Sequence, residues 1–139
     1  MATRVVLRVT YRFAGIHRWP TAPDGDTAFL RYPHRHIFHV TLGVVVAGLN
    51  RELEFLQLQE RLRVAISAVG SFSPIHVDVT PGVTYVDLDD LSCEMLATRL
   101  FTEFTTSGYE VTFVEVSEDG ENGARIEEVP CTPKKKSLR

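Results

Sequence analysis

Two long stretches of hydrophobic alternation constrain the fold of this chain most strongly. In residues 4–14 the odd positions are apolar and the even positions are largely Arg and Thr. Side chains of a β-strand point alternately to the two faces of a sheet, so this pattern predicts a half-buried strand. A second stretch, at about 34–48, carries its apolar residues at even positions. The two stretches therefore predict a pair of long neighbouring strands.

The apolar period then changes from two to about 3.6 residues, which is typical of helices. One stripe of this kind predicts a helix over about 55–69. A second stripe predicts a helix that begins near Asp89 or Asp90, because a carboxylate can cap a first helical turn. Gly108 is expected to end this second helix.

Two further strands are predicted at 111–117 and 124–129. The order of strand, strand, helix, helix, strand, strand predicts an α+β fold. We expect a four-stranded antiparallel sheet with two antiparallel helices on one face. The irregular segment between the helices is also compatible with a short strand at 75–79. One domain is expected over 1–129, followed by a flexible basic tail at 130–139.

Composition argues against several classes of protein. The net charge of −3 gives no sign of a nucleic-acid or membrane surface, and we expect neither partner. Lysines 134–136 are expected to form a solvated end. Cys93 and Cys131 show no metal-binding or redox spacing. No apolar run is long enough for a signal peptide or a membrane-spanning helix, so a cytoplasmic location is expected.

Histidines gather around the start of the second predicted strand. His34 and His36 are two residues apart and therefore share a face, and His17 lies just past the end of the preceding strand. Three imidazoles from neighbouring strands can hold zinc and leave one coordination position open, which is the catalytic arrangement of this metal. His39 has the opposite parity and is expected to be structural.

Two other residues are weaker candidates when judged by residue type alone. Glu118 ends a predicted strand, where an ionised carboxylate could accept paired hydrogen bonds from a guanidine-like ring edge. It could also be a solvated acid among acidic neighbours, and the residues alone favour this second interpretation. His76 is isolated between the two predicted helices.

Five short segments occur in order along the chain: Phe13–Arg18, His34–Phe38, Leu53–Phe55, Leu91–Ala97 and Val114–Glu118. They resemble the motifs F-x-A-x-H-R, H-G-H-N-Y, V-x-D-F, P-T-A-E-N-L-A and V-x-V-x-E. These motifs are those of the 6-pyruvoyl-tetrahydropterin synthases and 6-carboxytetrahydropterin synthases. The ordered set extends over nearly the whole chain.

This resemblance implies a tunnelling fold, in which oligomers join their sheets edge to edge and the active sites lie between subunits. We therefore expect a homo-oligomer, either a hexamer or a tetramer. The resemblance makes His17, His34 and His36 ligands of Zn²⁺ and makes Glu118 the anchor of a pterin ring. The family's substrate is 7,8-dihydroneopterin triphosphate, from which triphosphate is eliminated. The carboxytetrahydropterin branch instead cleaves the side chain and feeds 7-deazaguanine (queuosine) synthesis.

The chain departs from the family pattern where protons are transferred. The family's catalytic Cys lies just before its H-G-H motif, where this chain has Ala, Phe and Leu at 28–30. The family's L-D-H segment between the helices is not matched either. Asp26 and His76 are the candidates to replace these groups. Arg35 takes the place of the glycine between the two ligand histidines.

Three hypotheses follow. The first is a zinc-dependent carbon–oxygen lyase acting on 7,8-dihydroneopterin triphosphate or a related purine-derived substrate. The second is a non-catalytic protein of the same fold that binds a pterin- or purine-like small molecule. The third is a purely structural subunit, in which the zinc site could be vestigial.

Overall fold

The computed structural model describes residues 2–69 and 85–130. The two longest strands are neighbours that pair along their whole length, with Val5 opposite Val46 and His17 opposite His34. This confirms the strand pair that the alternation predicts. The elements in chain order are β1 (Val5–His17), a 3₁₀ turn η1 (Ala28–Arg31), β2 (His34–Val46), α1 (Phe55–Val69), β3 (Val86–Asp89), α2 (Cys93–Thr106), β4 (Val111–Glu118) and β5 (Asn122–Glu127).

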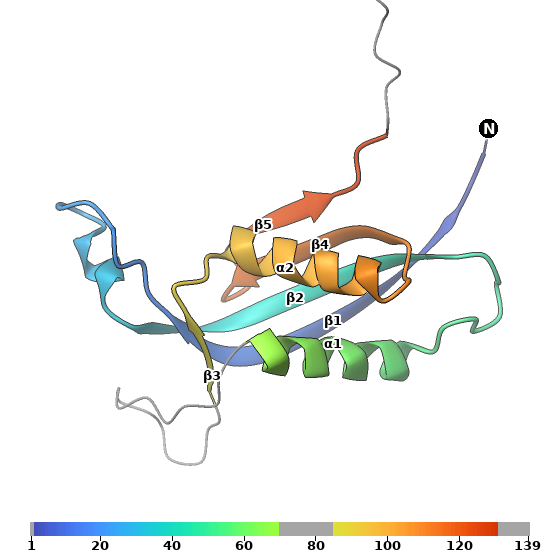
Figure 1. Cartoon of the computed structure of the whole chain (residues 1–139), viewed down its shortest axis with the longest axis horizontal. Helices are drawn as coiled ribbons and strands as arrows, with labels where there is room; N and C mark the ends of the chain where they lie inside the picture. Colours follow the sequence, from blue (N-terminus) through green and yellow to red (C-terminus); the bar gives the residue numbers. More distant parts are fainter. Residues whose placement is uncertain (1, 70–84, 131–139) are drawn as a thin grey trace, which may run out of the picture.

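The sheet has five strands in the order β3-β1-β2-β4-β5 (Figure 1). Four of them are the predicted strands, and they pair antiparallel. The fifth, β3, pairs parallel with β1 at Gly15–His17. The prediction of a four-stranded, wholly antiparallel sheet is therefore wrong, whereas the α+β class is confirmed. β3 is only four residues long, so periodicity could not separate it from the start of the following helix.

The second helix begins later than predicted. Ser92 is its N-cap, and the Ser92 hydroxyl accepts a hydrogen bond of 3.1 Å from the Met95 backbone N–H. Asp89 belongs instead to β3 and has a left-handed backbone (φ 52°). Hence neither predicted Asp cap is correct. The expected end is close to the observed one, because Gly108 has a φ of +96°, which glycine adopts without strain.

Both helices cover the same face of the sheet and run in opposite directions (Figure 1). Residues from α1, α2 and the inward face of the sheet form one buried cluster. Leu62 of α1, Leu100 of α2 and Val40 of β2 are each 0% exposed within it. In the described part of the chain, no helix is long and apolar enough to cross a membrane. The possible strand at 75–79, His76 and the predicted tail lie outside the described residues.

The strand register brings the candidate residues to one end of the sheet. β1 ends at His17 where β2 begins at His34, and β4 ends at Glu118 opposite Phe38 of β2. The Phe38 ring lies against both His17 and His36, with ring centroids 5.1 and 5.8 Å apart. The site is therefore built on paired strands above a buried aromatic ring.

Replacing a core leucine should destabilise this fold much more than replacing an exposed leucine of the same helix. Leu62 is 0% exposed and Leu56 is 72% exposed, and both are in α1. Leu62→Ala should lower the free energy of unfolding by about 2–5 kcal/mol, because it leaves a cavity. Leu56→Ala should change it by less than about 0.5 kcal/mol. Denaturant titration measures both values, and equal losses would contradict this packing.

Candidate metal centre

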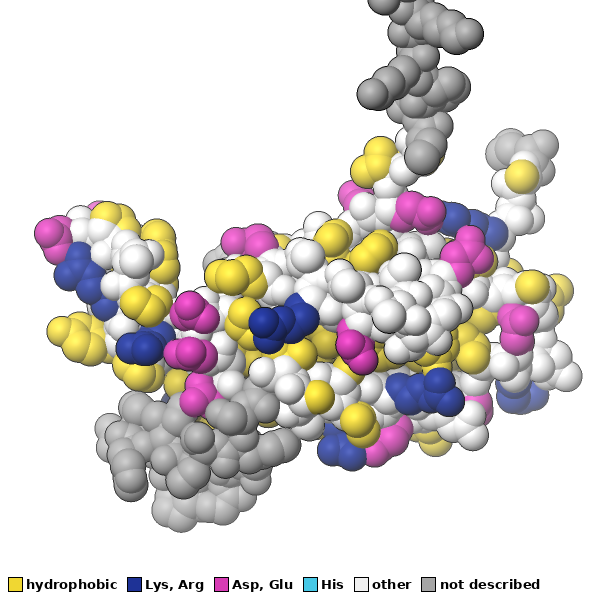
Figure 2. All heavy atoms as spheres, in the orientation of Figure 1, with side chains coloured by type: hydrophobic (Ala, Val, Ile, Leu, Met, Phe, Trp, Pro, Cys, Tyr) yellow, Lys and Arg dark blue, Asp and Glu magenta, His cyan; other side chains and the backbone are white. Residues whose placement is uncertain are grey.

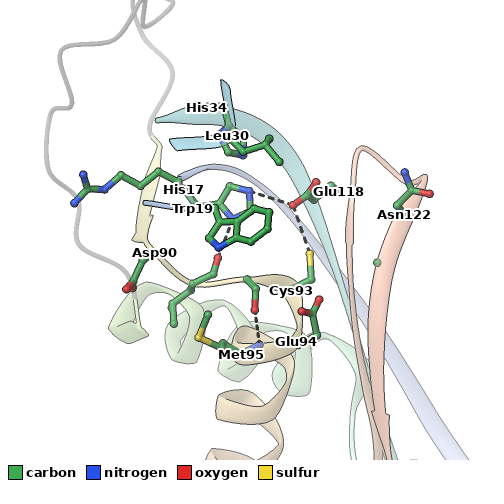
Figure 3. A pocket seen from close by; sticks show the side chains of 14 residues that line it. His17, Trp19, Leu30, His34, Asp90, Cys93, Glu94, Met95, Glu118 and Asn122 are labelled. Carbon is green, nitrogen blue, oxygen red and sulfur yellow. Dashed lines mark hydrogen bonds and ion pairs between the residues drawn. The ribbon is translucent and has the colours of Figure 1, made fainter. Parts of the chain in front are cut away.

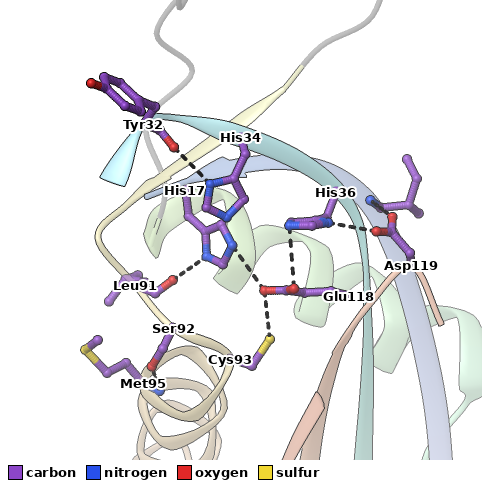
Figure 4. Close-up of polar contacts among 11 residues, drawn as sticks. His17, Tyr32, His34, His36, Leu91, Ser92, Cys93, Met95, Glu118 and Asp119 are labelled. Carbon is purple, nitrogen blue, oxygen red and sulfur yellow. Dashed lines mark hydrogen bonds and ion pairs between the residues drawn. The ribbon is translucent and has the colours of Figure 1, made fainter. Parts of the chain in front are cut away.

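Three histidines meet at the end of the sheet (Figure 4). Each of His17, His34 and His36 offers a ring nitrogen, and these atoms all lie within 4.8 Å of one another. The ring centroids are 4.6 Å apart for His17 and His34, and 5.1 Å apart for His34 and His36. The structure therefore brings together the three residues that the sequence predicts as ligands.

The Nδ1 atom of each ring is already engaged. His17 Nδ1 lies 2.8 Å from the Leu91 carbonyl, and His34 Nδ1 lies 2.9 Å from the Tyr32 carbonyl. A carbonyl only accepts, so each Nδ1 is the protonated nitrogen and the Nε2 lone pair is free. His36 Nδ1 is similarly held, 2.7 Å from a carboxylate oxygen of Asp119. Fixing one nitrogen in this way is how ligand histidines are oriented towards a metal.

His17 is the most buried of the three ligands. The residue is 8% exposed, and its Nε2 atom is buried without a hydrogen-bond partner among the described residues. Burial is the main cause that lowers the pKa of His17 from its ordinary value of 6.5, so the ring favours its neutral form. A neutral imidazole with a free, buried lone pair suits a metal ion, which supplies the missing partner.

Glu118 faces two of the three free nitrogens (Figure 4). Its Oε1 lies 3.1 Å from His17 Nε2, and its Oε2 lies 3.5 Å from His36 Nε2. The 3.1 Å distance between Glu118 Oε1 and His17 Nε2 is short enough for an ion pair. The two groups are not aligned for a hydrogen bond, because His17 Nε2 has no hydrogen-bond partner in the part of the chain that the structure describes. A carboxylate in this position can serve as a fourth metal ligand or accept hydrogen bonds from a ligand beside the metal.

Cys93 is a residue of this site that the sequence analysis missed. Its Sγ lies 3.8 Å from Glu118 Oε1 as a thiol donor. Burial, followed by the charge of Glu118, raises the pKa of Cys93 to about 12, so the thiol is protonated at neutral pH. No metal-binding spacing marks Cys93 in the sequence. The only signal in the sequence was its position in the segment Leu91–Ala97, which resembles the family motif P-T-A-E-N-L-A.

Asp119 is a second residue that the sequence analysis missed. Its Oδ2 holds His36 Nδ1, and its Oδ1 accepts a hydrogen bond of 2.9 Å from the Ile37 backbone N–H. These two hydrogen bonds, that of His36 first, lower the pKa of the Asp119 carboxyl. Asp119 has a left-handed backbone (φ 56°), which turns its side chain back towards β2. In the sequence, Asp119 and Gly120 follow the end of a predicted strand. This pattern indicates a turn but does not indicate a contact with a histidine.

A pocket of about 560 Å³ opens beside the histidines (Figure 3). Its walls include His17, His34, Glu118, Cys93 and Trp19. A pocket of this size fits a small molecule. Because the pocket and the free Nε2 atoms share a site, a bound molecule would lie next to a metal held there.

Of the two candidates for proton transfer, Asp26 is the one within the described residues, and it lies outside this pocket. Asp26 is exposed in the segment before η1, and it is not part of the pocket lining. His39 is not part of the lining either, in keeping with its opposite strand parity. His76 lies outside the described residues. In the described lining, Glu118 contacts His17 and Cys93 contacts Glu118, so these two groups can exchange protons beside the histidines.

Comparison with known proteins supports the fold and is silent on chemistry. No protein-family model matches the chain. No curated protein sequence matches it either. One similar solved structure is the uncharacterized protein WS1659 from Wolinella succinogenes, with a TM-score of 0.58 and 14% sequence identity. The match covers 92% of this chain and 100% of that chain, and at this identity it shows a shared fold alone.

Removing the support of one ligand should weaken metal binding without removing the ligand. Asp119→Asn replaces the carboxylate that holds His36 Nδ1. We expect zinc affinity to fall by about 10- to 100-fold, as is usual for such supporting groups. Competition with a chromophoric chelator measures the affinity. Glu121→Gln, an exposed acid two residues away in the same turn, is the control and should leave it unchanged. Equal affinities for all three proteins would show that Asp119 does not orient His36.

The pKa of His17 predicts a pH dependence of stability in metal-free protein. In the folded state this pKa is lower than the ordinary 6.5, so the unfolded chain binds the proton more readily. The contribution of His17 to stability is therefore complete well above pH 6.5 and is lost as the pH falls through 6.5 towards the folded-state pKa. Chelator-treated wild-type protein should lose more unfolding free energy between pH 7.5 and 5.5 than the His17→Gln variant, which lacks this group. Parallel curves from denaturant titration would contradict the shift.

Proposed function

We propose that this protein is a zinc-dependent member of the pterin synthase type, which binds a pterin- or purine-like ring beside the metal. The observation that carries the proposal is a cluster of three imidazoles, each of which offers a ring nitrogen within 4.8 Å of the others. Because each Nδ1 is engaged elsewhere, Nε2 is the nitrogen that each ring has left to offer a metal. The nature of the ligand ring is inferred from the resemblance of the five ordered segments to the pterin synthase motifs. The tunnelling fold belongs to the same proposal, with β3 as an addition to its sheet.

Zinc is the metal that best suits these donors. Three neutral imidazoles with a further open position are typical of catalytic zinc, whereas calcium and magnesium require oxygen ligands. When bound, the ion would supply a Lewis acid that polarises an oxygen of the ligand. His17 supports the assignment most strongly, because no described residue gives its buried Nε2 a hydrogen-bond partner, which a metal ion would replace.

The remaining pocket groups would bind and orient the ring. Glu118 would accept two N–H hydrogen bonds from an amino-pyrimidine edge. Cys93 donates towards Glu118 Oε1 and would keep that carboxylate positioned. Trp19 lies in the pocket wall and is 46% exposed, so its indole can cover the face of a planar ring.

The proposal covers two candidate functions, a lyase that converts its ligand and a protein that only binds it. One observation favours binding without conversion. A thiol with a pKa of about 12 is a poor base at neutral pH, and Cys93 is therefore no direct substitute for the family's catalytic Cys. We rank a carbon–oxygen lyase first because a metal with an open position suits such chemistry. A non-catalytic pterin- or purine-binding protein is the second candidate.

Metal analysis and a turnover assay test this proposal. Purified protein should contain about one zinc per chain, whereas His34→Ala should contain far less, because it removes one of three ligands. A stoichiometry near zero in the wild type would refute both candidates. Incubation with 7,8-dihydroneopterin triphosphate, followed by chromatography of the products, separates enzyme from binder. Triphosphate release that persists in His34→Ala would place any chemistry elsewhere.

Glu118 should be needed for the ring and not for the metal. Glu118→Ala should weaken neopterin binding by roughly 1.5–3 kcal/mol, as expected for a lost charged hydrogen-bond partner. Calorimetric titration of zinc-loaded protein measures this change, with Glu121→Gln as the control. Zinc content should stay at the wild-type value. A loss of zinc would instead make Glu118 a metal ligand, and unchanged neopterin affinity would remove it from the ring site.

Self-association is part of the proposal and rests on an open sheet edge. β3 covers β1 only at Gly15–His17, so the Val5–Ala14 backbone edge has no strand partner among the described residues. Unpaired edges favour strand addition. We expect a hexamer or tetramer in solution, which light scattering after size exclusion would detect. A monomeric mass at micromolar concentration would rule out edge-to-edge assembly.

A further inference from the structure

The charges around the pocket bear on which ligand it accepts. Three carboxylates line it, those of Asp90, Glu94 and Glu118, and Arg18 is the one Lys or Arg in the described lining. Figure 2 shows acidic side chains gathered over the connection between β3 and α2, where the pocket opens. A divalent ion at the histidines would balance this negative charge without producing a positive excess. The lining thus differs from sites that bind polyphosphates, which are rich in Arg and Lys.

The nearby arginines already have partners. Arg18 Nε lies 3.5 Å from Asp89 Oδ1. Arg31 lies outside the lining, donates to the Ala22 carbonyl at 2.7 Å and pairs with Asp24. In each case a carboxylate beside the guanidinium offsets part of the positive charge that would otherwise attract a phosphate group.

The start of α2 is the other group in the lining that could attract an anion. A helix N-terminus favours negative charge, and Ser92, Cys93 and Glu94 at this end all belong to the pocket. However, the Ser92 side chain already accepts from the Met95 N–H, and the Glu94 carboxylate lies in the first turn. The chain therefore supplies its own negative charge at this helix end, and a phosphate would meet Glu94 there.

We propose that this pocket selects an unphosphorylated, planar heterocycle and disfavours a polyphosphate ester of the same ring. This inference rests on the proposed function, since it assumes a pterin- or purine-like ring beside the metal. Within that function it argues against 7,8-dihydroneopterin triphosphate as the substrate and favours a related purine-derived compound that carries no polyphosphate. The apolar and aromatic parts of the lining, including Trp19, Leu30 and Met95, suit an uncharged ring. Glu118 accepts its N–H edge, while Asp90 and Glu94 repel phosphate groups.

Two ligands that share a ring and differ in charge test this selectivity. Oxidised neopterin and neopterin triphosphate are titrated calorimetrically into the zinc-loaded full-length protein at low salt. We expect neopterin to bind at least tenfold more tightly. A smaller difference, or tighter binding of the triphosphate, would overturn the inference and leave the proposed function standing. Failure of both ligands to bind would reject the ring site itself, and the inference with it.

A variant without two of the lining charges tests whether the acidic side chains cause the selectivity. Asp90→Asn combined with Glu94→Gln should tighten triphosphate binding at least threefold and keep neopterin affinity within twofold of wild type, which also shows that the pocket is folded. Glu103→Gln, a change of the same kind further along α2 and outside this pocket, is the matched control and should alter neither affinity. If the double variant left the ratio of the two affinities unchanged, the acidic lining would not be the source of selectivity.

Discussion

The antiparallel pairing of β1 with β2 is the constraint on which the rest of the site depends. The pairing runs without interruption over thirteen residues of each strand and places His17 opposite His34. A slip of one residue would turn every side chain of one strand to the opposite face. It would expose Val40 and its apolar neighbours and separate the three imidazoles. The same hydrophobic burial that fixes the core register therefore fixes the metal-binding geometry.

The groups that hold the three rings come from separate parts of the chain. Leu91, before α2, holds His17; Tyr32, before β2, holds His34; and Asp119, after β4, holds His36. Each contact engages Nδ1 and leaves Nε2 free. Two backbone carbonyls and one turn carboxylate thus orient the three rings. The presence of three histidines alone would not fix the direction of their Nε2 atoms.

The sequence predicts the parts of this structure that depend on period. Alternation places His34 and His36 on one face with Val40, and the helical stripes identify both helices. Sequence reasoning could not find β3, a strand of four residues of which three pair with β1 across a long crossover. It also missed Cys93 and Asp119, because their roles arise from a helix start that meets β4 and a left-handed turn that meets β2 only in the folded chain. Local pattern carries no information about such meetings.

The hydrogen bond between His17 and the Leu91 carbonyl joins residues 74 positions apart. It links the last residue of a core strand to the segment that leads into α2. A metal ion held by the imidazole cluster would therefore be coupled to the order of that segment. Backbone amides at the helix entrance would then exchange with solvent more slowly, and a change at the sheet end would be transmitted to the rim of the pocket.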